Sequence, residues 1–252
     1  MSFSIAVAGK GGTGKTTVAA LIVRYLRNNG LTPVLAVDAD PNANLGESLG
    51  LAVNLTVGSM IAQFNEEKIN LPPGMTKEAY LDVRLNETLV ESKRLDLLTM
   101  GRGQGAECYC YPNLILRKFI NSLIDNYPYM VMDNEAGMEH LSRKTTDNID
   151  VLLLVSNYTV KGLRAVTKIR ELAADLELSV GQKLVLLTSV PEKPETVMIE
   201  EMSRLNIIPA AYIPYDRLIQ EYDFASRSLL ELPDDAVSVT AINKMAADLL
   251  KR

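Results

Sequence analysis

The chain has 252 residues, of which 47% are hydrophobic, and a formal net charge of −5. This length fits one α/β domain, so we expect residues 1–252 to form a single domain, and the acidic balance argues against a nucleic-acid-binding surface. No run of ~18 apolar residues is present to cross a membrane. Because an apolar strand follows Met1 almost at once, we expect no signal peptide and a cytoplasmic location.

Apolar runs of strand length alternate with segments of helical periodicity along the chain. The predicted strands are residues 5–8, 34–37, 95–98, 129–132, 151–155, 184–187 and 207–213. The predicted helices are residues 16–29, 114–125, 160–176, 195–205 and 237–251. This alternation is typical of a doubly wound α/β fold, a mostly parallel sheet with helices on both faces. Residues 53–94 are the least regular region, and we interpret them as an insertion or a mobile edge of the same domain.

A phosphate-binding motif joins the first predicted strand to the first predicted helix. Residues 9–16 fit G-x-x-x-x-G-K-[ST] in the strand–loop–helix context that a P-loop requires. Backbone N–H groups of such a loop cradle phosphates, and the helix N-terminus adds positive potential. We expect Lys15 to meet the terminal phosphates of a nucleoside triphosphate and the Thr16 hydroxyl to hold Mg²⁺. The predicted phosphate site consists of Gly11, Gly12, Thr13, Gly14, Lys15, Thr16 and Thr17.

Acidic residues follow two of the predicted strands. Asp38 and Asp40 come after residues 34–37, and Asp133 comes after residues 129–132. The carboxyl ends of parallel strands share one edge of the sheet, so both clusters should face the P-loop. Carboxylates there can hold a Mg²⁺-bound water or orient the water that attacks a phosphate. For Asp38 an ordinary role as a helix cap or turn residue remains the alternative.

Both cysteines of the chain lie in the segment Cys108-Tyr109-Cys110, on a glycine-flanked loop. Two thiolates on the same side of an extended segment make half of a soft-metal site, and a twofold dimer would supply four sulfurs for Zn²⁺ or Ni²⁺. The alternative is two small side chains that pack as hydrophobic groups. His140 is the single histidine, and we interpret it as a cap or surface contact rather than a metal ligand.

In combination these motifs resemble the MinD/ParA and nitrogenase iron-protein superfamily. The features in common are the P-loop with its early lysine and the two acidic segments, and the C-x-C between those segments narrows the resemblance. This order looks like the CooC-type nickel-insertion ATPases, which mature carbon monoxide dehydrogenase and acetyl-CoA synthase. The resemblance runs over most of the chain. It implies an ATP-driven homodimer that carries nickel at its interface and delivers it to an apo nickel enzyme.

The resemblance also implies roles for single residues. Lys10 would reach across the dimer interface to the nucleotide of the partner, whereas a solvated loop lysine is the alternative. Asp40 would orient or activate water, Asp133 would contact the Mg²⁺ shell, and Asp38 would support them. The predicted catalytic residues are therefore Lys10, Lys15 and Asp40, acting in a slow ATPase.

The chain departs from the superfamily pattern where the base is bound. Related ATPases often place an Asn that reads adenine where this chain has Thr188 followed by Ser189. Pro214 lies in a segment that resembles the second adenine-contacting loop, although an ordinary strand-to-helix turn has the same composition.

Two other functions share the P-loop. A MinD/ParA-type partitioning or positioning switch would bind membrane or DNA, but the apolar stripe of residues 237–251 is more typical of a core-facing helix than of a membrane anchor. An iron–sulfur carrier resembling the nitrogenase iron protein would take cysteines from two separate loops, which the adjacent pair here does not match.

Overall fold

The computed structural model describes residues 2–66, 74–102, 119–135, 148–175, 179–193 and 195–251. In these ranges the chain forms a sheet with the strand order β3-β4-β2-β5-β1-β6-β7-β8. The pairings are parallel except for the antiparallel pair β3–β4 at one edge. The strands are β1 (Phe3–Gly9), β2 (Val34–Ala39), β3 (Leu89–Val90), β4 (Leu95–Thr99), β5 (Tyr129–Asn134), β6 (Asn148–Asn157), β7 (Ser179–Val190) and β8 (Pro209–Pro214).

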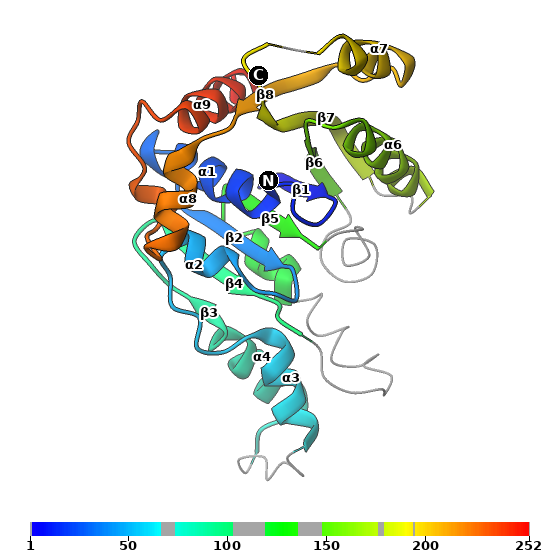
Figure 1. Cartoon of the computed structure of the whole chain (residues 1–252). Helices are drawn as coiled ribbons and strands as arrows, with labels where there is room; N and C mark the ends of the chain where they lie inside the picture. Colours follow the sequence, from blue (N-terminus) through cyan, green and yellow to red (C-terminus); the bar gives the residue numbers. More distant parts are fainter. Residues whose placement is uncertain are drawn as a thin grey trace.

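Helices cover both faces of this sheet (Figure 1). One face packs against α1 (Lys15–Asn28), α2 (Leu45–Leu49), α8 (Arg217–Phe224), the 3₁₀ turn η2 (Leu229–Glu231) and α9 (Val237–Leu250). The other face packs against α3 (Val57–Glu66), α4 (Lys77–Asn86), a helical stretch at residues 119–124, α6 (Val160–Asp175) and α7 (Thr196–Arg204). Figure 1 shows α3 and α4 at the β3 end of the sheet and α7 at the β8 end.

Successive strand residues feed two separate hydrophobic cores. On β1, Ile5 and Val7 belong to the core under α1 and α9, whereas Ala6 and Ala8 belong to the core on the opposite face. Side chains of a strand point alternately to the two faces of its sheet, so a strand that is covered on both faces has to be apolar at nearly every position. This requirement explains the unbroken apolar runs that mark the strands in the sequence.

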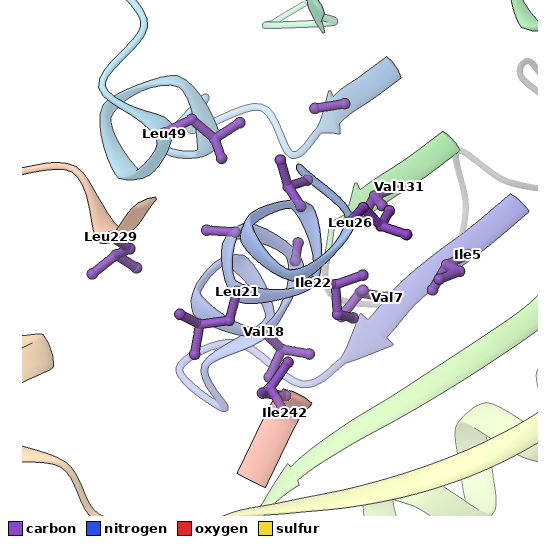
Figure 2. Packing of buried hydrophobic residues seen from close by; sticks show 14 of the residues in the cluster. Ile5, Val7, Val18, Leu21, Ile22, Leu26, Leu49, Val131, Leu229 and Ile242 are labelled. Carbon is purple, nitrogen blue, oxygen red and sulfur yellow. The ribbon is translucent and has the colours of Figure 1, made fainter. Parts of the chain in front are cut away.

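The P-loop helix α1 is packed on several sides, because elements from distant parts of the chain surround it. Figure 2 shows its side chains between the sheet, α2, η2 and α9. Leu26 is fully buried in this core. Truncating such a leucine to alanine costs about 2–5 kcal/mol of folding free energy. The helix that begins with the phosphate-binding residues is thus held as a rigid part of the fold.

The predicted fold class is confirmed, and every predicted strand overlaps an observed strand, although β8 begins at Pro209 rather than at residue 207. Strands β6 and β7 extend beyond their predicted apolar centres, because polar residues such as Asp150 and Gln182 interrupt the apolar pattern within them. The interpretation of residues 53–94 was incomplete, since α3, α4 and β3 form there and bury residues such as Met60 and Leu85 in the core. The short helices α2 and α8 were not predicted either. Residues 114–118 and 176, at the ends of two predicted helices, lie outside the described residues.

Candidate functional site: a phosphate-binding loop with buried acidic neighbours

The predicted P-loop connects β1 to α1 and requires glycine for two separate reasons. A Cβ atom on Gly9 would lie 2.2 Å from the carbonyl oxygen of Val155 on β6, a distance that no side chain tolerates. Gly12 and Gly14 have φ angles of 75° and 84°, in the left-handed region that other residues rarely adopt. The glycines therefore allow both a tight approach of β1 to β6 and the turn into the helix.

The N-terminus of α1 presents backbone donors beside a buried cation. The first bond of this helix runs from Val18 N–H to Gly14 O (2.9 Å), and no side chain caps the helix. The N–H groups of Lys15, Thr16 and Thr17 come before that bond, and such groups at a helix start bind anions. Lys15 is itself buried. The predicted phosphate-binding residues thus meet at one helix terminus.

Asp38 and Asp133 lie next to each other at the carboxyl ends of β2 and β5. They are partners in the register of the parallel pair β2–β5, and both are almost completely buried. Burial raises the pKa of Asp133 to about 7, opposed by the hydrogen bond from Thr16 and reinforced by the neighbouring charge of Asp38. Burial also raises the pKa of Asp38 to about 6, opposed by two backbone hydrogen bonds. The hydrogen bonds around these two carboxylates therefore offset only part of the cost of burying their charge.

The residues predicted to surround Mg²⁺ contact each other directly. The Thr16 hydroxyl donates a hydrogen bond of 2.6 Å to Asp133 Oδ2. The second oxygen, Asp133 Oδ1, is buried and has no hydrogen-bond partner among the described residues. Buried polar atoms are nearly always paired, and oxygen is the ligand type that Mg²⁺ prefers. A hydroxyl, a carboxylate with an unpaired oxygen and an adjacent anion site are the donor set that Mg²⁺ with a nucleotide would use.

Asp38 and Asp40 differ in their surroundings. Asp38 Oδ2 accepts a hydrogen bond from Leu45 N–H (2.8 Å), and Oδ1 accepts one from Asp40 N–H (3.1 Å). These contacts are those of a turn and helix-start residue, which is the alternative that the sequence left open for Asp38. Asp40 is only half-buried, and its Oδ1 accepts a hydrogen bond from Asn42 N–H (2.9 Å). Asp40 therefore lies at the accessible rim of the site, whereas Asp38 shapes the backbone below it.

The side chain of Lys10 lies on the solvent-facing part of the loop. Lys10 is exposed, while its backbone carbonyl accepts a hydrogen bond of 2.8 Å from the Thr13 hydroxyl. The backbone of this residue is thus held in place, and its side chain is accessible to solvent.

A cavity of about 550 Å³ adjoins the P-loop on the β7 and β8 side. Thr188, Pro214 and Tyr215 line it together with Gly12–Gly14 of the loop. The volume is typical of small-molecule sites. Pro214, a candidate base contact in the sequence analysis, thus lines a cavity beside the P-loop.

Helix α8 supplies cavity residues that the sequence analysis missed. Gln220 lines the cavity and pairs with the Tyr215 hydroxyl (2.6 Å). Asp216 caps α8 by accepting from Leu218 N–H (3.0 Å). An Asp before a short helical pattern is an N-cap signal, so this helix start was visible in the sequence. A second hollow of about 420 Å³ lies between α8 and α2 and shares Thr17, Ile219 and Gln220 with the first.

The predicted soft-metal residues Cys108 and Cys110, together with His140, lie outside the described residues. In the ranges that are described, no group of three or more His, Cys, Asp or Glu side chains could hold a metal ion. The helices in those same ranges are also too short or too polar to cross a membrane.

Comparison with known proteins assigns the chain to a family. The model of the CobQ/CobB/MinD/ParA nucleotide-binding domain matches residues 4–249. The chain belongs to this family. The predicted relation to MinD and ParA is thereby confirmed, and the phosphate-binding loop described above is the loop of a nucleotide-binding domain.

Two curated relatives and one solved structure illustrate the range of this family. An uncharacterized ATP-binding protein of Methanocaldococcus jannaschii is 37% identical over 250 residues, covering 98% of both chains. The carbon monoxide dehydrogenase accessory protein CooC of Rhodospirillum rubrum is 28% identical over 244 residues, covering 90% of this chain and 89% of that protein. A ParA family ATPase from Chlorobium tepidum matches with a TM-score of 0.75 at 19% identity, covering 98% and 99% of the two chains, which shows a common fold.

Proposed function

We propose that residues 1–252 form one P-loop ATPase domain that binds Mg²⁺ and ATP, hydrolyses ATP slowly, and acts as a homodimer. The observation that carries the ATPase part is the contact between Thr16 and Asp133, in which the buried Asp133 Oδ1 has no hydrogen-bond partner among the described residues and Lys15 interacts electrostatically with the carboxylate. Mg²⁺ would contact the second carboxylate oxygen of Asp133, and a triphosphate would contact Lys15 and the N–H groups at the start of α1. The raised pKa of Asp133 supports the proposal, because the bound cation would favour the ionised carboxylate.

In the proposed reaction the protein mainly positions the ATP and the attacking water, and it stabilises the charge on the phosphates. Lys15 and the N–H groups at the start of α1 bind the phosphates, while Thr16 and Asp133 hold the Mg²⁺ site. Mg²⁺ would neutralise the charge that develops on the phosphate oxygens. Asp40, at the accessible rim, orients the attacking water and accepts its proton. Asp38 fixes the backbone at this rim by accepting hydrogen bonds from the N–H groups of Asp40 and Leu45.

Dimerisation is proposed to run through Lys10. Its side chain is exposed at the edge of the loop, and its backbone is fixed by Thr13. A lysine in this position can reach a nucleotide held by a second copy and stabilise the charge of the transition state, as a cation supplied in trans does in other phosphoryl-transfer enzymes.

We further propose that the dimer carries nickel and assists its insertion into carbon monoxide dehydrogenase or acetyl-CoA synthase. Support comes from Cys108-Tyr109-Cys110 and from the 28% identity to CooC, the carbon monoxide dehydrogenase accessory protein. Two sulfurs from each protomer would make a four-thiolate site, which suits Ni²⁺ as cargo and also binds Zn²⁺. Binding should weaken at low pH because the thiols have to lose their protons.

Equilibrium dialysis with Ni²⁺ and with Zn²⁺ tests the cargo. We expect one metal ion per dimer, thiolate charge-transfer absorption with Ni²⁺, and loss of both in the Cys108→Ser/Cys110→Ser protein, which should still bind ATP. The Lys15→Ala variant is the matched control, since it should bind metal and lose ATP. One ion per monomer, or unchanged binding in the double variant, would exclude the four-thiolate site.

A positioning or partitioning ATPase is the second candidate. It is favoured by the match to a family model that includes MinD and ParA and by the fold in common with the ParA family ATPase. Failure of the dialysis test, together with ATP-dependent association with lipid vesicles or DNA, would put this function first.

A further inference from the structure

Two threonine hydroxyls hold the backbone of the phosphate-binding loop on the side that faces β7 and the cavity. Thr188, at the carboxyl end of β7, donates from Oγ1 to the carbonyl oxygen of Thr13 (2.9 Å). Thr13 is buried and donates in turn from its own Oγ1 to the carbonyl oxygen of Lys10 (2.8 Å). The end of β7 is thus joined to the loop by two successive hydrogen bonds.

The position of Thr188 makes this link rigid. On β7 it is in register with Asn157 of β6 and Ile213 of β8, so strands on both sides hold it. Its backbone carbonyl also accepts a hydrogen bond from Tyr158 N–H (3.0 Å). The next residue, Ser189, has a φ angle of 54° where the pairing with β8 becomes irregular. The sharp turn of the backbone thus comes one residue after Thr188, whose side chain contacts the loop.

Covalent geometry relates this link to phosphate binding. In a trans peptide the C=O and N–H bonds of one unit point in opposite directions. The bond from Thr188 to Thr13 O therefore also directs the N–H of Gly14 away from β7. By the same reasoning, the bond from Thr13 to Lys10 O directs the N–H of Gly11. Backbone N–H groups are the donors with which a P-loop holds phosphate.

The Thr188 hydroxyl has no second proton to donate to a nucleotide base. It has one proton, and that proton is shared between Thr13 O at 2.9 Å and the more distant Ser156 O at 3.3 Å. Towards the cavity Thr188 can present only a lone pair and its methyl group, which lies within van der Waals distance of the position that a Cβ on Gly14 would take. The donor capacity of this residue is thus used on the loop.

We infer that Thr188 is a positioning residue for the triphosphate, which it serves by aiming backbone donors of the P-loop rather than by reading the base. This inference rests on the proposed nucleotide binding and adds a specific prediction to it. Thr188→Val keeps the shape and removes the hydroxyl. Loss of one neutral hydrogen bond is worth about 0.5–1.5 kcal/mol, so triphosphate affinity should fall roughly threefold to tenfold.

Isothermal titration with Mg²⁺ and two ligands, ATP and inorganic tripolyphosphate, tests the inference. Tripolyphosphate has the phosphates without the base, so Thr188→Val should weaken both ligands by the same factor, and Thr188→Ser should restore both. Thr88→Val is the matched control. Thr88 is buried, donates to Leu85 O (2.7 Å), and lies next to β3 at the opposite end of the sheet. The Thr88→Val substitution should lower the melting temperature and leave the affinities for ATP and tripolyphosphate unchanged.

Three results would overturn the inference while leaving the proposed function intact. They are unchanged affinities in Thr188→Val, a loss for ATP but not for tripolyphosphate, and an equal loss in the Thr88→Val control. The second result would assign Thr188 to base recognition, and the third would assign the effect to general destabilisation. If the unaltered protein binds neither ligand, the proposed nucleotide binding fails as well.

Discussion

Stability of the ligand-free protein should decrease as the pH rises towards neutrality, because of Asp133. Burial raises the pKa of this carboxyl from 3.8 to about 7. A group whose pKa is higher in the folded than in the unfolded state binds its proton more tightly when folded. Protonation therefore stabilises the fold fully below about pH 4. This contribution is lost as the pH rises through the folded pKa, and it is gone above about pH 8.

The size of the effect follows from the shift. One pKa unit corresponds to about 1.4 kcal/mol, so a rise of about three units amounts to about 4 kcal/mol between the two ends of this range. Asp133→Asn has no charge at any pH and should lack this part of the slope. The ligand-free variant should consequently be more stable than the unaltered protein at about pH 8, by up to roughly 4 kcal/mol.

Urea unfolding of both proteins without nucleotide, at about pH 5 and about pH 8, measures the difference. Asp248→Asn is a suitable control, because it removes an exposed carboxylate that forms a surface ion pair with Lys251 (3.4 Å). Mg²⁺ and ATP should flatten the slope of the unaltered protein by stabilising the ionised carboxylate. Equal slopes in Asp133→Asn and the unaltered protein would refute the reasoning, as would a stability that increases with pH.

Three further predictions concern the loop and its rim. Asp40→Ala should bind ATP and fail to hydrolyse it in a phosphate-release assay, and hydrolysis at the unaltered rate would rule out its role in orienting water. Lys10→Ala should weaken ATP-dependent dimerisation in light scattering more than it weakens ATP affinity, whereas normal dimerisation would remove the trans-acting lysine. Gly9→Ala should destabilise the fold by about 1–3 kcal/mol, because its Cβ would meet Val155 O at 2.2 Å. If the Gly9→Ala protein had an unchanged melting temperature, the expected clash with Val155 O would be refuted.

Local chemistry was sufficient for the sequence to predict the strands, the P-loop and the acidic residues. A strand covered on both faces must be apolar throughout, and a loop that cradles phosphate needs glycines followed by Lys15 and Thr16. These constraints act within a few residues, so they are visible in a single sequence. The short helix α2 has a weak local signal and is stabilised by packing, and for that reason it was missed. Helix α8 has an N-cap signal at Asp216, but with eight residues it is too short for its periodicity to stand out in the sequence.

What only the tertiary structure decided is which distant groups meet. Thr16 and Asp133 are 117 positions apart, and Thr188 and Thr13 are 175 positions apart, yet each pair is joined by a hydrogen bond. The pKa shift of Asp133 also arises from burial by the assembled sheet rather than from its neighbours in the chain. In a parallel sheet the strand order sets these meetings, because it brings the carboxyl ends of β1, β5 and β7 to one edge. The residue types were therefore readable from the sequence, while their pairing and their energetics came from the fold.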